Sequence, residues 1–408
     1  MGRFDEEAPS TDAAVPGLDR RTLWTLLAGN ALTGVGIGFF LPILPLFIRS
    51  RGGGALLVGL VFAGGVVGRA LAQYPGGWLA DHIGRKPVIV GALLMYALVF
   101  PLYLLPLPVW FLVGLRVMHA LAAGAYLPAA AAMIGDLGGS RKARAFGMLR
   151  SSDMVGLVLG PAVGGLVAGF NLGAVFWVGT AFCLLATGMM LFLPAVHGPR
   201  GAAARRSAET APFQVGRVLW RLAPFLALAM PLGWAFATYD TIWSLYLTSR
   251  GATYFQVGIS FATYGIPLVF LGGLAGRFVD RFGRLRSAIA SVLAFAIFLA
   301  IYPLISSVLL LILFGLLEGA MTLPSNPALL TGVSDAAPPG AQGRTQGAFQ
   351  SASYGAEALG ALVAGGIYGF APAAAFWTAA ALIVVGSGAA LLLRRVQIPG
   401  GRRAPALP

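Results

Sequence analysis

A charged, glycine-containing segment occurs twice in this chain, each time between two long apolar runs. The first copy reads G-G-W-L-A-D-H-I-G-R-K over residues 76–86, and the second reads G-R-F-V-D-R-F-G-R-L-R over residues 276–286. Their aspartates, Asp81 and Asp280, lie 199 residues apart, and a second pair of related segments, starting at Gly147 and Gly347, repeats at an offset of 200. The sequence therefore predicts an internal duplication of about half the chain.

The apolar runs between these segments are long enough to cross a membrane. Hydrophobic residues make up 58% of the chain and charged residues only 10%, against roughly 25% charged residues in soluble domains. A spanning helix needs about 20 apolar residues, and continuous runs of that length favour helices over a membrane barrel. We predict an all-α membrane protein of about twelve transmembrane helices, in two pseudo-symmetric six-helix bundles. The expected spans are 22–48, 54–80, 87–106, 109–136, 147–169, 173–194, 219–248, 254–278, 286–304, 306–332, 346–370 and 373–394.

Polar segments divide the chain. Residues 195–218 form the longest polar connection between apolar runs, and the first twenty residues carry five acidic side chains without the apolar core of a signal peptide. Because six spans separate each motif from its copy, both copies lie on one side of the membrane. The predicted order is a polar tail (1–21), an N-terminal bundle (22–194), a linker (195–218), a C-terminal bundle (219–395) and a second tail (396–408).

The net charge of +14 is explained by orientation in the membrane. On this topology only Arg49, Arg51 and Arg250 fall in the outer loops, whereas the inner loops are rich in lysine and arginine. Both termini and the linker are therefore expected in the cytoplasm, with the chain in the cell (inner) membrane. The loops are too short for a nucleic-acid-binding domain, so anionic lipid is the expected partner of the excess positive charge.

Two motifs resemble those of the major facilitator superfamily. The loop after the second span carries the family's best-known signature, at Gly77, Asp81, Gly84, Arg85 and Lys86, with a weaker copy around Asp280 and Arg284. The fifth span carries G-x-x-x-G-P-x-x-G-G, which resembles the motif of the drug/proton antiporter branch, at Gly156, Gly160, Pro161, Gly164 and Gly165. The resemblance covers the chain apart from its tails and implies the twelve-helix major facilitator fold, with transport by antiport.

Each motif also has a physical interpretation. Asp81, near a helix end, can accept hydrogen bonds and pair with an arginine of the other half, which would make a conformational latch. Alternatively, Arg85 and Lys86 only anchor the loop to lipid phosphates. The glycine stripe of the fifth span lets another helix backbone approach closely, either as a sliding seam or as plain tight packing.

Charged side chains inside the membrane are the best candidates for a functional site, because burying a charge is costly. We predict proton coupling by the residues Glu318, Asp240, Asp153, Glu357, Arg116 and His119. Glu318 ranks first, because a buried carboxyl group can exchange a proton near neutral pH. The repeat offset places it opposite His119, so the two are expected to face one central cavity from opposite halves. Each of these carboxylates has the alternative role of a structural ion pair. Arg116 lies in R-V-M-H-A-L-A-A-G, which resembles the family's fourth-helix motif and implies a role in modulating a neighbouring carboxylate's proton affinity.

The substrate site is predicted from polar and aromatic residues in the spans. The candidates are Asn30, Arg69, Tyr126, Trp234, Tyr239, Trp243 and Tyr264, with Tyr74 and Phe236 as further lining residues. Asp240 has a second possible role, because a carboxylate beside aromatic rings can hold a cation. Arg69 lies about 18 Å along the helix from Asp81 at 1.5 Å per residue, where it can bind an anion or pair with Asp240.

No enzyme signature is present. The chain has no G-x-S-x-G or H-E-x-x-H motif and no phosphate-binding loop, and its single cysteine, Cys183, excludes an internal disulfide. We predict a monomeric secondary transporter without metal or cofactor, in which protons and a small-molecule substrate compete during rocker-type alternating access. Proton-coupled export of amphipathic compounds or drugs is the leading interpretation. A nutrient or organic-anion symporter and a lipid or lysolipid translocator remain open alternatives.

Overall fold

The computed structural model describes residues 20–137, 142–194, 215–337 and 342–397. Within these ranges the chain is helical, as the long apolar runs predict. Most of the predicted linker and most of both predicted tails lie outside the described residues. The helices of the first half are α1 (Arg20–Phe40), α2 (Leu44–Ser50), α3 (Ala55–Ile83), α4 (Arg85–Leu102), α5 (Phe111–Leu137), α6 (Lys142–Phe170) and α7 (Ala174–Met190).

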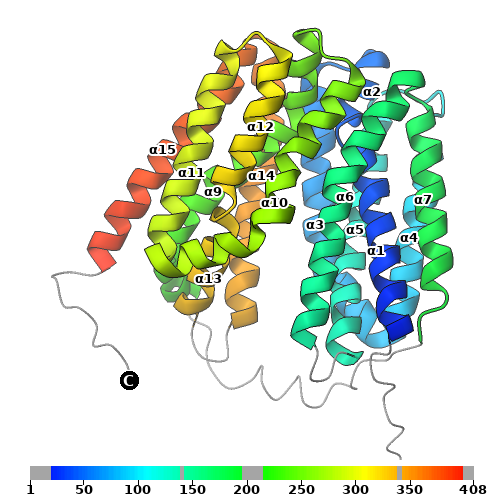
Figure 1. Ribbon diagram of the computed structural model, residues 1–408, viewed down its shortest axis with the longest axis horizontal. Helices are drawn as coiled ribbons and strands as arrows, with labels where there is room; N and C mark the ends of the chain where they lie inside the picture. The colour runs from blue at the N-terminus through cyan, green and yellow to red at the C-terminus, as the bar shows by residue number, and fades with distance from the viewer. Residues whose placement is uncertain (1–19, 138–141, 195–214, 338–341, 398–408) are drawn as a thin grey trace, which may run out of the picture.

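The second half repeats this order of helices. It consists of α9 (Val215–Ser249), α10 (Tyr254–Phe282), α11 (Arg284–Ile301), a short 3-10 turn η2 (Tyr302–Leu304), α12 (Val308–Thr322), α13 (Ser325–Ala336), α14 (Gln342–Tyr368) and α15 (Pro372–Gln397). In Figure 1 the two halves stand side by side, with the blue-to-green N-terminal half on the right and the green-to-red C-terminal half on the left.

Ten segments of the described chain are long and apolar enough to cross a membrane. The pair α1/α2 and the pair α12/α13 each count as one such segment. Two further helices complete the twelve predicted spans: α7, with only 17 residues, and α14, which is long but carries many polar side chains. The prediction of a twelve-helix membrane protein is confirmed. Several polar side chains of α14 line a cavity.

Two expected spans are broken helices instead of continuous ones. The first span stops at Phe40 and resumes at Leu44, around Pro42 and Pro45. The tenth stops at Thr322 and resumes at Ser325, beside Pro324 and Pro327. Proline lacks an amide hydrogen and clashes with the preceding turn, so closely spaced prolines interrupt the ladder of helix hydrogen bonds.

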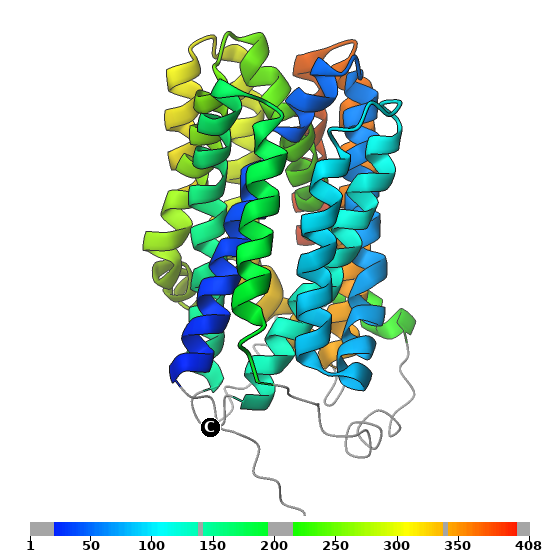
Figure 2. The same ribbon diagram turned by 90° about the vertical axis from the view of Figure 1, so that its right-hand side faces the viewer.

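The two halves meet mainly along two pairs of helices, α6 with α10 and α3 with α14, with smaller contacts of α9 with α2 and α3. α1 begins and α15 ends at the same end of the bundle, here called the terminal end, which is the lower end in Figures 1 and 2. Near the opposite end, glycine faces glycine in both contacts between the halves. A Cβ added to Gly258 would lie 3.0 Å from the Cα of Gly165, and one added to Gly365 would lie 2.9 Å from the Cα of Gly59.

These two glycine contacts are related by the internal duplication. Gly165 and Gly365 are 200 residues apart, and Gly59 and Gly258 are 199 apart. Without Cβ atoms the four backbones approach closely, so the halves close tightly at the end opposite the termini. Toward the terminal end the second half of α10 loses these contacts, and Cβ atoms added to Gly272 and Gly273 would meet nothing within 4 Å. The halves are closed at one end and separated at the other.

Candidate functional site

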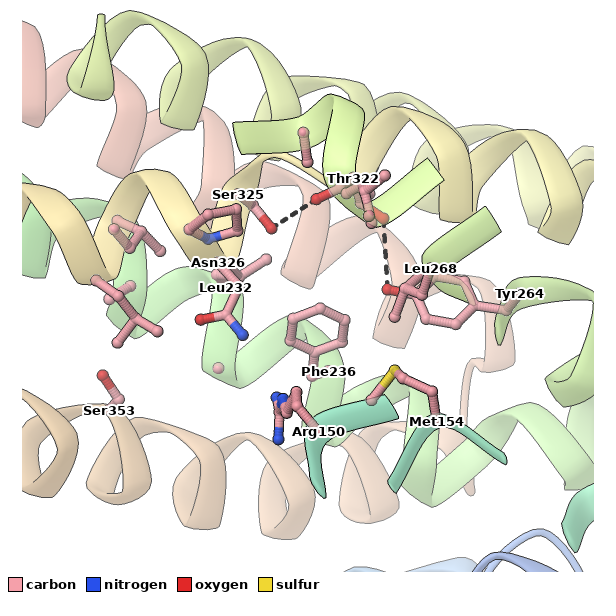
Figure 3. A pocket seen from close by; sticks show the side chains of 18 of the residues that line it. Arg150, Met154, Leu232, Phe236, Tyr264, Leu268, Thr322, Ser325, Asn326 and Ser353 are labelled. Carbon is pink, nitrogen blue, oxygen red and sulfur yellow. Dashed lines mark hydrogen bonds between the residues drawn. The ribbon is translucent and has the colours of Figure 1, made fainter. Parts of the chain in front are cut away.

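A cavity of about 900 Å³ lies between the halves and extends toward the terminal end. The C-terminal half supplies most of its wall, from α9, α10, the end of α12, α13 and α14, whereas the N-terminal half contributes the start of α6. Figure 3 shows Arg150 and Met154 of α6 below the Phe236 ring, with Asn326 and Leu232 to its left. A cavity of this size accommodates a drug-sized molecule.

The cavity wall combines apolar surface with a substantial set of polar groups. Leu232, Phe236 and Leu268 are among its apolar residues, and its polar side chains include Arg150, Ser151, Tyr264, Thr322, Ser325, Asn326, Gln350, Ser353 and Glu357. Gln350, Ser353 and Glu357 follow one another at helical spacing on α14 and form one face of that helix. α14 is less apolar than the other long helices because this polar face borders the cavity and not lipid.

The break between α12 and α13 forms part of the cavity wall. The Ser325 hydroxyl donates to the Thr322 carbonyl (2.7 Å), and the Thr322 hydroxyl lies 3.4 Å from that of Tyr264 (Figure 3). Asn326 follows directly and lines the cavity. The prolines that interrupt the helix thus present backbone and side-chain polar groups to the cavity at membrane depth, where irregular backbone is tolerated.

Glu318 lies one helical turn from Thr322, behind the cavity wall. Its side chain is 1% exposed and accepts a hydrogen bond from the Tyr302 hydroxyl through one carboxylate oxygen. The other oxygen, Oε1, has no hydrogen-bond partner among the described residues. The Thr322 hydroxyl donates to the Glu318 carbonyl at 2.9 Å, so a cavity-lining residue directly contacts the turn that carries this carboxylate.

His119 does not face the cavity, contrary to the expectation that it and Glu318 share one. It is fully buried within the N-terminal half, stacked between Tyr96 (4.9 Å between ring centroids) and Tyr103 (5.4 Å). Its Nε2 lies 3.2 Å from the Tyr96 carbonyl. The duplication is nevertheless visible, because Tyr103 and Tyr302 are also 199 residues apart and each accompanies the ionisable residue of its own half.

An ion pair joins the two halves across the middle of the bundle. Arg69 of α3 donates to Glu357 of α14 at 3.0 Å, and its guanidinium lies 4.9 Å from the centre of the Tyr354 ring. One turn along α3, the Gln73 amide donates to the Tyr354 hydroxyl at 3.0 Å. Arg69 therefore pairs with Glu357 and not with Asp240, although Asp240 lies within electrostatic range of both.

Asp240 and Arg116 are charged groups without an ion-pair partner in the described part of the chain. Asp240 is exposed on α9, and Arg69, Arg116 and Glu357 are its electrostatic neighbours. Arg116 lies between α3 and α5, with its guanidinium 5.9 Å from the Phe62 ring and with Nε lacking a hydrogen-bond partner. Two opposite charges are thus available near the central pair.

The Arg69–Glu357 pair gives a direct test of how the halves are held. We expect Arg69→Gln or Glu357→Gln to lower the population of this state, relative to the state open at the other end, by about fivefold. The reason is that a partly exposed ion pair contributes about 1 kcal/mol to stability. The exchange Arg69→Glu/Glu357→Arg should restore much of the loss. The measurement is alkylation of a cysteine replacing the cavity residue Met154, in a background with Cys183→Ala. Equal alkylation in all four proteins would contradict a role for the pair in the balance of states.

Three more of the predicted residues form a polar cluster inside the N-terminal half. The Asn30 side-chain amide donates to Asp153 (2.6 Å) and to Ser152 (2.8 Å), and the Tyr126 hydroxyl donates to the Asn30 side-chain oxygen Oδ1 (2.8 Å). Asp153 also lies 3.6 Å from Arg150, which reaches the cavity wall. None of Asn30, Tyr126 and Asp153 lines the cavity itself, so their connection to it passes through Arg150.

Only some of the predicted aromatic residues line the cavity. Phe236 and Tyr264 do. Tyr239 and Trp243 are stacked on each other (4.7 Å) and buried behind them, next to Tyr302, while Trp234 packs against Gly360. Tyr74 is 83% exposed on α3 and lines no part of the cavity. Side-chain direction in helices that are apolar all round cannot be read from the sequence.

The signature loops form ion pairs within each half. Arg85 is buried and bonds to both Asp81 and Asp136 (3.0 Å to Asp136), while Lys86 donates to the Leu191 carbonyl (2.6 Å). In the second half Arg284 pairs with Asp335, which is related to Asp136 by the offset of 199. Asp280 is exposed, and the glycines Gly84 and Gly283 take positive φ values at the turns between helices.

Asp81 therefore does not pair with an arginine of the other half in this state, contrary to expectation. It is 62% exposed and its partner is Arg85, four residues on. The physical reason is the separation of the halves at the terminal end, where both signature loops lie.

The glycine motif of the fifth span serves two contacts. Cβ atoms added to Gly156, Gly160 and Gly164 would come within 3 Å of the α1 backbone of the same half. Gly165 instead faces Gly258 of α10, and the Pro161 carbonyl lies 2.2 Å from a Cβ added to Gly258. Most of the stripe is tight packing within a half, and its last residue and Pro161 belong to the contact between halves.

Sequence reasoning missed the residues that make most of the polar cavity wall, including Arg150, Thr322, Ser325, Asn326, Gln350 and Ser353. Two signals were available: the Pro-Ser-Asn-Pro run in the tenth span, and the polar spacing along α14. Both are unusual within membrane helices, since unpaired polar groups are costly in lipid.

Comparison with known proteins establishes the family. The model described as Major Facilitator Superfamily matches residues 26–248 and again residues 225–407, one match for each half. The chain belongs to the Major Facilitator Superfamily. It is thus a multi-pass membrane protein of a transporter family.

Among relatives of this superfamily member are two bacterial proteins named for drug resistance. The quinolone resistance protein NorA of Staphylococcus aureus is 27% identical over 297 residues, which are 71% of this chain and 72% of NorA. The multi-drug resistance efflux pump PmrA of Streptococcus pneumoniae is 28% identical over 324 residues, 74% of this chain and 79% of PmrA.

Solved transporter structures share the fold. The nucleoside transporter NupG superposes with a TM-score of 0.75 at 16% identity, covering 92% of this chain and 99% of NupG. A bacterial homologue of the lysosomal transporter Spinster gives 0.72 at 14% identity, covering 94% and 98%. At these identities the likeness establishes the major facilitator fold and carries no information on substrate.

Proposed function

We propose that this protein is a proton-coupled antiporter that exports small amphipathic compounds, including drugs. The observation that carries the proposal is the cavity of about 900 Å³ between the halves, with its mixed apolar and polar wall and a buried carboxylate one turn behind it. The resemblance to NorA and PmrA, whose names refer to quinolone and multi-drug resistance, supports the same substrate class.

The proposed mechanism is alternating access by rocking of the two halves. With both termini in the cytoplasm, the present state opens inward, and the glycine contacts Gly165–Gly258 and Gly59–Gly365 close the outer side. Substrate enters the cavity from the inner side while Glu318 is deprotonated. Protonation of Glu318 from the outer side then favours substrate release, because a bound proton lowers the affinity for substrate and bound substrate lowers the affinity for the proton.

Glu318 is the proposed proton carrier on geometric grounds. Its unpartnered Oε1 can take up a proton, Tyr302 holds the other oxygen, and Thr322 places this turn against the cavity. Asp240, Asp153 and Glu357 are further carboxylates of the coupling network, and Arg69 and Arg116 are the cations that compete for them.

A transport assay separates the antiporter from its alternatives. Proteoliposomes with an acidic interior are given fluorescent lipophilic cations or neutral amphiphiles outside, with matched vesicles lacking the gradient. Uptake driven by proton exit is the expected result. In vesicles preloaded with the compounds, their movement outward together with protons would instead favour a symporter of nutrients or organic anions, for which Arg150 offers a cation in the cavity. Gradient-independent movement of a labelled lysolipid would favour a lipid translocator.

The signature loop is proposed to set the balance between states. We expect Asp81→Asn to reduce turnover severalfold without changing which compounds are transported, because Asp81 lies outside the cavity and bonds only to the Arg85 network. The check is the ratio of initial rates for two unlike substrates in variant and wild type. A changed ratio, or an unchanged rate, would remove this role. Lys86→Gln is the matched control for lipid anchoring of the same loop.

A further inference from the structure

A second cavity, of about 510 Å³, lies in the C-terminal half at the terminal end. It is formed by the start of α9, the turn between α10 and α11, and the end of α15, all on the left-hand side of Figure 1. It shares no residue with the transport cavity. Its wall contains three arginines, Arg284, Arg286 and Arg394, together with Phe225 and Phe282. A cavity with this lining is built for an anion with an apolar attachment.

The positive charge of this arginine cavity is only partly neutralised. Arg284 pairs with Asp335, but Arg286 and Arg394 have no ion-pair partner within the described ranges. The first turn of α11, which contains Arg284 and Arg286, holds no acidic residue, and Gly283 provides no side-chain cap for it. Its unpaired amide groups therefore add to the attraction for an anion that the arginines create.

The internal duplication does not account for this cluster. Arg284 corresponds to Arg85 at the offset of 199, but Arg286 corresponds to Pro87, and Arg394 corresponds to Pro194 at the offset of 200. Arg85 is buried with two carboxylate partners, whereas half of the Arg284 side chain is exposed to its cavity. Arg286 and Arg394 thus stand at positions where the other half has proline, and Lys86 of that half is replaced here by Leu285, which lines the cavity.

We propose that this arginine cavity binds the phosphate headgroup of an anionic phospholipid. Guanidinium groups bind phosphate oxygens in a planar, bidentate geometry, and the cavity lies at the helix ends, where headgroups are found. Phe225, Phe282 and Leu285 line the same space, and Leu391 and Leu392 are exposed on α15 next to Arg394. This apolar surface continues from the headgroup site toward the bilayer, as an acyl chain requires and a free phosphate does not.

The site contacts a helix of the transport cavity. Asp335, the partner of Arg284, lies on α13, and Phe225 packs against Gly332 of the same helix. α13 also carries Ser325, Asn326, Leu329 and Leu330 of the transport cavity wall. A bound phosphate that draws Arg284 away from Asp335 loosens α13, so occupancy of this site is linked to the state of the cavity.

The test measures lipid binding directly. The detergent-solubilised full chain is titrated with phosphatidylglycerol or with phosphatidylcholine and the bound lipid is counted by native mass spectrometry. Wild type is expected to prefer phosphatidylglycerol, and Arg286→Gln/Arg394→Gln to bind it about thirtyfold more weakly, since each of the two arginines near a headgroup contributes about one kilocalorie per mole. The matched control is Arg277→Gln/Arg395→Gln, which removes the same charge from exposed positions outside the cavity.

Each outcome decides the proposal. Retained binding in the control with loss in the cavity variant supports it, and equal loss in both variants overturns it in favour of a diffuse surface charge. Full displacement of phosphatidylglycerol by millimolar inorganic phosphate would overturn the lipid assignment, because the headgroup alone would then suffice. Circular dichroism of both variants shows whether each is folded, and failure of drug transport leaves the result unaffected, since the readout is lipid binding.

Discussion

Glu318→Gln is expected to abolish proton-driven transport while leaving the fold and substrate binding largely intact. Glutamine has nearly the same shape, and its carbonyl oxygen can still accept the hydrogen bond from Tyr302. What it removes is the ability of a fully buried group to gain and lose a proton. Gradient-driven uptake into proteoliposomes should fall to the level of empty vesicles, and exchange of labelled for unlabelled substrate without a gradient should persist.

Two companion variants make this result specific. Glu318→Asp keeps a carboxyl group at a shorter reach and should retain part of the driven transport. Tyr302→Phe removes the hydrogen-bond donor but not the titratable group, so it should slow transport and shift its pH dependence without eliminating coupling. Driven transport by Glu318→Gln at the wild-type rate would show that the proton is carried elsewhere, and Asp240 would then be the next position to test.

Gly258→Leu is expected to prevent closure of the end opposite the termini and to stop transport. A Cβ at this position would lie 2.2 Å from the Pro161 carbonyl oxygen, which is backbone and cannot move aside as a flexible side chain would. The halves must therefore separate there, and overpacking of a tight contact costs about 1–3 kcal/mol. That cost shifts a balanced equilibrium between the two open states by about fivefold to more than a hundredfold.

The accessibility of the cavity from each side measures this shift. With cysteine at Met154 in a Cys183→Ala background, a membrane-impermeant thiol reagent added from the outside should label the Gly258→Leu protein faster than the parent. Gly59→Leu, the duplicated contact, should act in the same direction, because its Cβ would lie 2.5 Å from the Ala361 carbonyl oxygen.

Gly169→Leu is the matched control, since it also lies toward the closed end of α6 but a Cβ there meets nothing within 4 Å. Unchanged labelling in both contact variants would mean that the glycine contacts do not control closure.

The two predictions address different parts of one cycle. Glu318 supplies coupling to the proton gradient, and the glycine contacts allow the halves to exchange which end is closed. Loss of the first should leave exchange running without a gradient, whereas loss of the second should stop exchange as well. The Arg69–Glu357 pair joins the two halves beside the cavity.

The sequence by itself determined the class of fold, the number of spans and the duplication, because these depend on properties that act along the chain. Lipid requires about 20 apolar residues per span whatever the packing, and the offsets of 199 and 200 follow from motifs such as Asp81 and Asp280. The intramembrane charges were also identifiable, since a charge such as Glu318 in an apolar run stands out. The broken tenth span was foreseeable only in part, from its closely spaced prolines.

Tertiary structure alone decided which of these residues meet. Helices that are apolar on every side do not reveal their inner face, so the sequence could not place His119 in an aromatic cluster, pair Arg69 with Glu357, or separate Gly165 from the rest of its stripe. Nor could it show that the cavity is built mainly by one half, since duplication predicts equal contributions. The two halves share a backbone arrangement but differ in their side chains and contacts. The cavity therefore forms only when the twelve helices are packed together.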